Sequence, residues 1–149
     1  MYKAITINDN EDFLRQVSYE VNIEKDKELN DDIKILENYC KRNHVLAMAA
    51  IQLGINKRII YLKNTSFEFV QNVQNRTIPK EEELEYDESL VLINPVILKS
   101  EGLTEYWEAC VSCLDNMGKV LRPYKIHLEY YDINGNRHEK VFEGFEATV

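Results

Sequence analysis

The chain has 149 residues, of which 44% are hydrophobic and 30% are charged, an ordinary composition for a globular domain with its own core. Its formal net charge of −8 argues against a nucleic-acid partner, because proteins that bind a phosphate backbone usually present a basic face. No apolar run approaches the roughly 18 residues of a membrane span, and the first residues contain no signal-peptide core. Three cysteines, an odd number, cannot all belong to a closed disulfide framework. We therefore expect one reduced, cytoplasmic domain over residues 1–149.

The first half of the chain predicts a helix followed by a strand. Residues 9–22 form a polar lead with a small apolar face. Over residues 26–42, apolar side chains recur at three- and four-residue steps, which is the spacing of a helix with one buried face. The small, apolar stretch VLAMAAIQLGI (45–55) comes next, and RIIYL (58–62) predicts a buried strand.

The middle of the chain contains an acidic stretch and a second strand. Residues 63–89 are polar and acidic and have no clear period, which indicates a solvated surface excursion. LVLINPVIL (90–98) is rich in β-branched residues but is interrupted by Asn94 and Pro95. Because proline cannot donate a hydrogen bond to a strand ladder, this strand is expected to lie at a sheet edge or to bend there.

The most secure local prediction is a hairpin near the end of the chain. Residues 124–145 alternate polar and apolar side chains on both sides of Asn134 and Gly135. Asn-Gly tolerates the positive φ angles of a tight hairpin turn. An early helix followed by several strands predicts an α+β fold, with antiparallel or mixed sheets packed around helices.

Cys110 and Cys113 form a C-x-x-C motif whose purpose the surrounding residues must decide. A catalytic redox pair normally opens a helix, whose amino terminus lowers the thiol pKa. Here the pair lies among strand-like residues, and the nearby Glu108 and Asp115 would raise a thiol pKa. A redox role is therefore disfavoured, while metal binding and simple burial remain open.

A structural zinc site would need four ligands, and few residues are left to complete one. Cys40 and His44 are four apart on a predicted helix, but a buried cysteine and a surface histidine explain them more simply. His138 and Glu139 look like the start of H-E-x-x-H, yet the match fails because residue 142 is Phe. His138 is expected to be an exposed strand residue, and His127 a strand residue as well.

Gln52 is the uncharged polar residue that stands out, because it ends the small, apolar stretch LAMAAIQ. A buried amide must be hydrogen-bonded. The simplest interpretation is that its side chain satisfies a neighbouring backbone group, and a role in a functional site is the alternative.

Four segments of the chain, taken in order, resemble the peptide deformylases. DNEDFLRQVSYEV (9–21) is similar to the family's amino-terminal segment, and VLAMAAIQ (45–52) to its first signature, Gly-apolar-Gly-apolar-Ala-Ala-x-Gln. LINPVIL and YWEACVS (106–112) are similar to the Asn-Pro strand and the second signature, Glu-Gly-Cys-apolar-Ser. The final 28 residues, 122–149, resemble the hairpin that precedes the third signature. The resemblance covers nearly the whole chain.

The resemblance implies a function and a set of site residues. The family removes the formyl group from the formyl-methionine of nascent peptides, with ferrous iron, replaceable by zinc or nickel, as its metal. Cys110 matches the metal-ligand cysteine, so Cys113 is expected to be incidental. Gln52 and the backbone N–H of Val111 would stabilise the oxyanion. The segment that includes Leu46 and Ala47 would line the cleft, where the peptide pairs with it as an extended strand.

Several positions depart from the family pattern. Val45 and Ala47 replace both glycines of the first signature, and their side chains are expected to narrow the cleft. Ala109 replaces the glycine of the second signature. Glu108 and Arg122 match family positions and are expected to pair and brace the Cys110 loop.

The 149 residues contain no H-E-x-x-H motif, which in this family supplies two histidine ligands and the catalytic glutamate. We therefore expect a chain that is truncated before that helix, is inactive alone and does not hold metal stoichiometrically. Without that helix, an apolar sheet face would be exposed and would favour self-association. Two alternatives are a non-catalytic descendant that binds peptides or a protein in the remnant cleft, and an enzyme completed by a second chain.

Overall fold

The computed structural model describes the backbone of residues 3–63, 89–109 and 117–143, and the side chains of 3–63, 89–103 and 121–142. Its elements in chain order are α1 (Ile7–Leu14), α2 (Leu29–Arg42), β1 (Ala47–Ala49), the 3-10 helix η1 (Ala50–Leu53), β2 (Ile59–Lys63), β3 (Ser89–Glu101), β4 (Thr104–Ala109), β5 (Met117–Arg122), β6 (Lys125–Tyr131) and β7 (Arg137–Glu143). The expected α+β fold is confirmed. Most of the acidic excursion, residues 64–88, lies outside the described residues.

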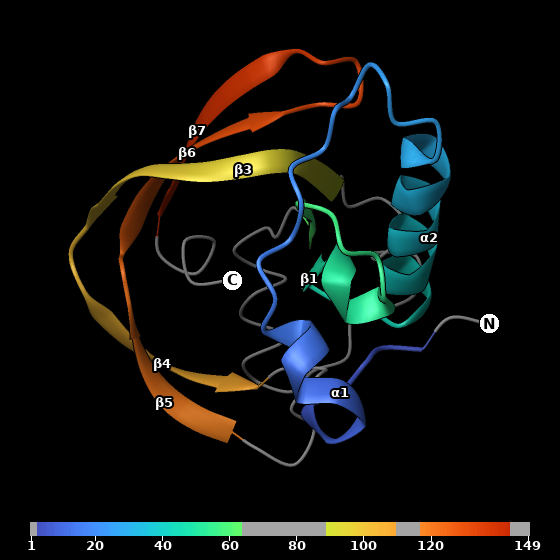
Figure 1. The fold of residues 1–149 in the computed structure, drawn as a ribbon. Coiled ribbons are helices and arrows are strands. Elements are labelled where there is room, and N and C mark those ends of the chain that lie inside the picture. Colours follow the sequence, from blue (N-terminus) through green and yellow to red (C-terminus); the bar gives the residue numbers. More distant parts are fainter. Residues whose placement is uncertain (1–2, 64–88, 110–116, 144–149) are drawn as a thin grey trace.

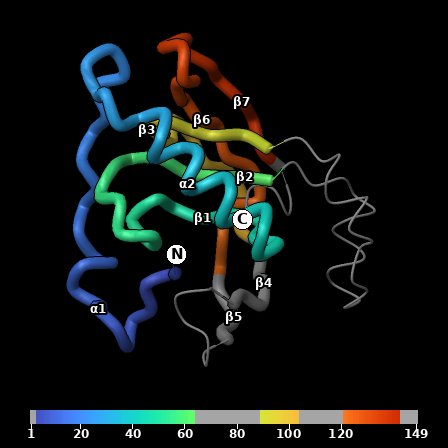
Figure 2. Tube along the Cα trace, turned by 90° about the vertical axis from the view of Figure 1, so that its right-hand side faces the viewer, coloured from blue at the N-terminus to red at the C-terminus, as the bar shows by residue number. Residues whose placement is uncertain are grey.

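Five of the strands form an antiparallel sheet in the order β1-β2-β3-β6-β7, and β4 pairs with β5 in a separate ribbon. The helix α2 packs against β1 and β2, as Figures 1 and 2 show from two directions. A strap of chain, residues 15–28, joins α1 to α2 and crosses the molecule beside the sheet (Figure 1). Among the residues that the structure describes, no helix is long and apolar enough to cross a membrane.

The helix α2 confirms the predicted helical spacing. Its buried residues lie three or four positions apart: Leu29, Ile33, Leu36 and Cys40. The helix ends in a Schellman motif, in which the Val45 N–H donates to the Cys40 carbonyl at 2.9 Å. His44 occupies the left-handed position of this motif, with a φ of 54°. Cys40 and Val45 are both buried, which supplies the hydrophobic contact typical of the motif.

Two apolar clusters form the core. The larger one joins α2 to the sheet and the strap and includes Leu36 and Ile93, both fully buried. The smaller one gathers residues of the central strands and the hairpin: Leu92, Leu128, Tyr130 and Phe142. Each large side chain buried in this way contributes about 1.5–3 kcal/mol relative to exposure. Both clusters include or contact residues of β2 and β3, so these two strands lie at the centre of the fold.

The strand β3 is longer than the predicted 90–98 and lies between β2 and β6 rather than at an edge. Its register shifts between Ile93 and Val96, which is where Asn94 and Pro95 stand. The strand therefore bends at the proline, which was one of the two expected outcomes. The bulge lets an inner strand tolerate a residue without an N–H donor.

The predicted hairpin is confirmed as β6–β7, but its turn differs from the expected tight Asn-Gly turn. Only Gly135, of the two turn residues, has a positive φ (82°). Its N–H donates to the Asp132 carbonyl at 3.0 Å, and the Asp132 N–H donates to the Asn136 carbonyl at 3.0 Å. This pattern is a longer connection with a left-handed glycine, typical of a bulged hairpin.

Candidate active site

Gln52 lies on the one-turn helix η1, between β1 and the start of β2. Its side-chain Oε1 accepts a hydrogen bond from the Ala49 N–H at 3.0 Å. Its carbonyl accepts one from the Ile5 N–H at 2.7 Å, which ties the amino-terminal segment to η1. Gly54, with a φ of 85°, ends the helix. The expectation that this amide satisfies a neighbouring backbone group is confirmed, and the bond to Ala49 also fixes the orientation of the amide.

Ala47 begins β1, and Leu46 lies directly before it at one side of the sheet. Ala47 pairs with Leu62, and the Lys63 N–H donates to the Leu46 carbonyl at 2.8 Å. The side chains of Leu46 and Ala47 are both half-buried. Because β1 is the terminal strand in the order of the described sheet, only one of its edges is paired with a described strand.

The two replaced glycines of this segment need no special backbone. Neither Val45 nor Ala47 has a positive φ, so a side chain adds no backbone strain. Val45 is 8% exposed and belongs to the larger core cluster. The expectation that Val45 narrows a surface cleft is therefore wrong, because its side chain packs inward. Ala47 remains at the half-buried edge.

Cys110, Val111 and Cys113 lie outside the described residues, as does the side chain of Glu108. The structure does describe the ribbon on either side of them, since β4 ends at Ala109 and β5 begins at Met117. In the ribbon, Glu108 is opposite Gly118 and Arg122 is opposite Thr104. The pairing of Glu108 with Arg122 stays a prediction.

The three histidines lie on separate elements or faces. His44 is exposed at the end of α2. His127 approaches Glu139, with Nε2 and Oε2 3.4 Å apart, and His138 contacts Asp132, with Nε2 and Oδ2 2.8 Å apart. The register of β6 and β7 puts the two hairpin histidines on opposite faces. His127 and His138 are strand residues, as expected, and His138 is exposed.

The described residues do not supply a metal centre. Among them, no three histidine, cysteine, aspartate or glutamate side chains come together as ligands. Cys40 is 1% exposed, and burial, followed by the nearby charge of Glu37, raises the pKa of its thiol to about 12. A neutral, enclosed thiol is a poor ligand and a poor nucleophile. The residues that the structure describes therefore do not fit a catalytic divalent ion by themselves.

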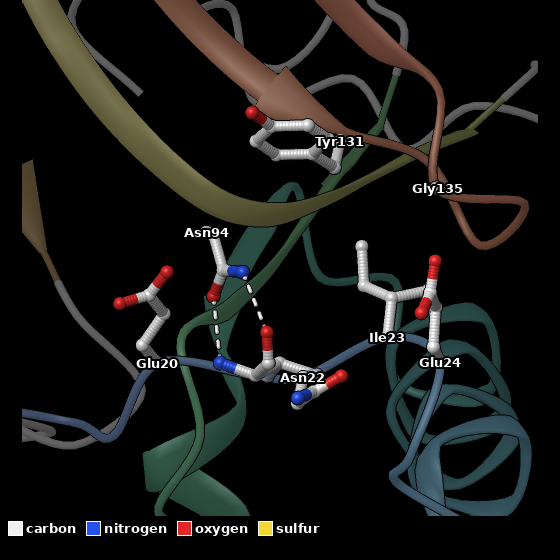
Figure 3. Close-up of a pocket in the computed structure, with 8 residues that line it drawn as sticks. Glu20, Asn22, Ile23, Glu24, Asn94, Tyr131 and Gly135 are labelled. Atoms are coloured by element: carbon white, nitrogen blue, oxygen red, sulfur yellow. Dashed lines mark hydrogen bonds between the residues drawn. The ribbon is translucent and has the colours of Figure 1, made fainter.

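A surface cleft of about 560 Å³ lies between the strap and the hairpin turn, and Figure 3 shows the residues that line it. Glu20 and Glu24 stand on the strap side, with Tyr131 and Gly135 on the hairpin side. Asn94 also lines the cleft, and its side chain bonds the backbone of Val21. Sequence reasoning missed this arrangement, and the only signal for it was the Asn-Pro interruption of an apolar strand.

The model of the polypeptide deformylase family matches residues 2–149. The chain belongs to the polypeptide deformylase family. The family assignment made from the sequence resemblance is thereby confirmed.

Curated relatives carry the same family name. Peptide deformylase 2 of Rickettsia conorii is 32% identical over 151 aligned positions, which cover 97% of this chain and 70% of that protein. The peptide deformylase of Clostridium beijerinckii is 33% identical over 71% of this chain and 62% of its own length. That of Rhizobium meliloti is 36% identical over 69% of this chain and 51% of its own length. The chain therefore spans about half to 70% of these relatives.

Solved structures of peptide deformylases share the fold. A probable peptide deformylase from Synechococcus phage S-SSM7 superposes with a TM-score of 0.78 at 27% identity, over 100% of this chain and 88% of that one. A Met-Ala-Ser-bound peptide deformylase from Acinetobacter baumannii gives 0.78 at 22% identity, over 99% of this chain and 87% of that one. At this lower identity the similarity shows the fold alone.

Proposed function

We propose that the protein acts in the deformylase reaction, the removal of the N-formyl group from the formyl-methionine of nascent peptides. The observation that carries the proposal is the placement of Gln52. Its amide is oriented by Ala49 and stands next to β1, the terminal strand of the sheet. An oriented donor beside a strand edge suits a substrate that binds as an extended peptide and develops negative charge on a carbonyl oxygen.

Each proposed site residue has a defined task. The edge of β1 that no described strand pairs with, beginning at Ala47 and preceded by Leu46, would align the peptide backbone. The Gln52 amide and the Val111 N–H would donate to the oxyanion, and Cys110 would be a thiolate ligand for ferrous iron, zinc or nickel. Glu108 and Arg122 support the Cys110 segment. The family match over residues 2–149 supports these assignments, which follow from the resemblance of the sequence segments to the family's signatures.

The two histidine ligands would have to come from outside residues 1–149. The sequence has no H-E-x-x-H motif. His127 and His138 contact carboxylates of the hairpin on opposite faces, and His44 lies at the end of α2. One thiolate alone binds a divalent ion poorly. We therefore propose that a polypeptide of these 149 residues alone holds no stoichiometric metal and does not release formate.

The proposal is tested by extending the polypeptide with a family-type H-E-x-x-H helix and measuring formate release from formyl-Met-Ala-Ser under anaerobic conditions with ferrous iron. We expect the extended protein to release formate and its Cys110→Ala variant to release none. Gln52→Glu keeps an oxygen for the Ala49 N–H but removes the amide donor, so we expect it to fold and to be slow. Rapid turnover by Gln52→Glu would contradict the assigned role.

Binding without turnover is the outcome that would favour the alternative, a peptide- or protein-binding descendant. It would appear as saturable binding of formyl-Met-Ala-Ser to β1, seen in amide NMR shifts, with no formate from either polypeptide.

Self-association is a separate proposal, based on exposed apolar side chains of β3: Val96, Ile97 and Leu98. Sedimentation as a concentration-independent monomer would rule it out. A cytoplasmic location is proposed because the reaction acts on nascent chains.

A further inference from the structure

The β4–β5 ribbon continues the β3–β6 pairing of the five-stranded sheet beyond a break in the ladder, because β3 leads directly into β4 and β5 leads directly into β6. The pairing runs up to Glu101 opposite Lys125 and resumes at Thr104 opposite Arg122. Both strands bend at this point, as Figure 1 shows on the side away from α2. The direction in which β4 runs is therefore decided at the break.

Gly102 is the residue that this break requires. Its φ is +68°, a left-handed conformation that strains any residue with a Cβ. A Cβ placed on Gly102 would lie 3.3 Å from the Cβ of Tyr124, closer than an ordinary contact. On the opposite strand Pro123 has no N–H to donate, so the ladder cannot continue through the bend. The left-handed backbone and the short distance to Tyr124 are thus two separate reasons why glycine is favoured at this position.

The bend turns β4 back towards the part of the molecule that holds β1 and η1 (Figure 1). The last residue of β4 is Ala109, and the next residue in the chain is Cys110. We propose that Gly102 is a positioning residue, which by bending the chain sets where Ala109, the last residue of β4, lies relative to β1 and η1. The functional meaning rests on the proposed deformylase site, whereas the bend itself does not.

The test measures orientation rather than stability. Residual dipolar couplings of backbone amides give the orientation of β4 and β5 relative to β2 and β3 in the 149-residue chain. We expect Gly102→Ala to change this orientation. Gly102→Asn should change it less, because asparagine tolerates the left-handed region but still brings a Cβ against Tyr124. The matched control is Gly135→Ala, because Gly135 has a φ of +82° with nothing within 4 Å of its Cβ position.

Gly135→Ala introduces comparable backbone strain at another turn, so it should lower stability and leave the ribbon orientation unchanged. The proposal is overturned if Gly102→Ala and Gly102→Asn both keep the unsubstituted orientation. If Gly102→Ala does not fold, Gly102→Asn alone decides, and an unchanged ribbon again overturns the proposal. A failed formate assay with a reoriented ribbon would count against the deformylase site and not against the positioning role.

Discussion

Asn94 holds the backbone of Val21 from both sides, across 73 positions of the chain. Its Oδ1 accepts from the Val21 N–H at 2.8 Å, and its Nδ2 donates to the Val21 carbonyl at 2.8 Å. Asn94 itself is in the left-handed region, with a φ of 52°, and its own N–H donates to the Arg58 carbonyl at 2.9 Å. One amide side chain thereby acts as a strand partner for the strap, which otherwise has few backbone bonds to the sheet.

We predict that Asn94→Ala lowers the free energy of unfolding by about 3 kcal/mol, from two lost hydrogen bonds and a left-handed alanine. Asn94→Gly should cost less, about 2 kcal/mol, because glycine adopts this φ freely. Urea denaturation measures both. The control is Asn38→Ala on the exposed face of α2, which should be nearly neutral. Equal effects of Asn94→Ala and Asn38→Ala would contradict the role of the bonds to Val21.

The left-handed residue at the end of α2 offers a stabilising substitution. His44 has a φ of 54° at the position where glycine is preferred. We predict that His44→Gly raises the free energy of unfolding by about 1 kcal/mol and that His44→Ala does not. Thermal unfolding of the two variants distinguishes them, and a lower midpoint for His44→Gly would show that the Schellman geometry is not retained in solution.

A half-buried ion-pair cluster fastens the strap to α2. The Lys57 Nζ lies 2.8 Å from an Asp26 oxygen and 2.5 Å from an Asp32 oxygen. We predict that Lys57→Met lowers the free energy of unfolding by about 2 kcal/mol, since it leaves two partly buried carboxylates without their cation. Lys41→Met is the matched control, because Lys41 makes only an exposed pair with Glu37 at 3.8 Å. Comparable losses in the two variants would argue against the cluster.

The same cluster predicts a pH dependence. The hydrogen bond from Lys57 lowers the pKa of Asp26 in the folded chain. The stability that Asp26 contributes is therefore fully present above the ordinary aspartate pKa of 3.8 and is lost as the pH falls through the lowered pKa. Burial disfavours the charged Lys57, but its bonds to Asp26 and Asp32 outweigh this and raise its pKa. That contribution is lost only as the pH rises through a value above 10.5. The stability difference between the unsubstituted chain and Lys57→Met should therefore be largest between these limits and should shrink in acid.

The buried thiol of Cys40 should be unreactive in the folded chain. Its pKa of about 12 leaves almost no thiolate at pH 8, and its side chain is enclosed in the core. In a Cys110→Ser, Cys113→Ser variant, iodoacetamide should modify Cys40 slowly under native conditions and rapidly in urea. Mass spectrometry follows the reaction, and rapid native modification would mean that α2 opens locally.

Local features of this fold followed from the sequence, whereas its long-range contacts did not. The spacing of Leu29 and Leu36 predicted α2, and the alternation around Gly135 predicted the β6–β7 hairpin, because these patterns reflect which face is buried. The inner position of β3 and the grip of Asn94 on Val21 depend on pairing between distant segments, which periodicity does not encode. The bulge at Pro95 made an inner strand possible where a proline suggested an edge.

The candidate site shows the same division. The bonded amide of Gln52 could be predicted because a polar group in an apolar stretch needs a partner, and Ala49 is three residues away. The inward packing of Val45 could not, because it depends on the left-handed turn at His44 that precedes it. The assignments of Cys110 and Val111 come from the family's signature and stay predictions.

The most direct test of the proposed function is the release of formate from formyl-Met-Ala-Ser by the 149-residue polypeptide, assayed anaerobically with added ferrous iron. We predict no release above background, with metal analysis showing no stoichiometric iron, and release once an H-E-x-x-H helix is appended. Iron-dependent release by the unextended polypeptide that Cys110→Ala abolishes would contradict this account.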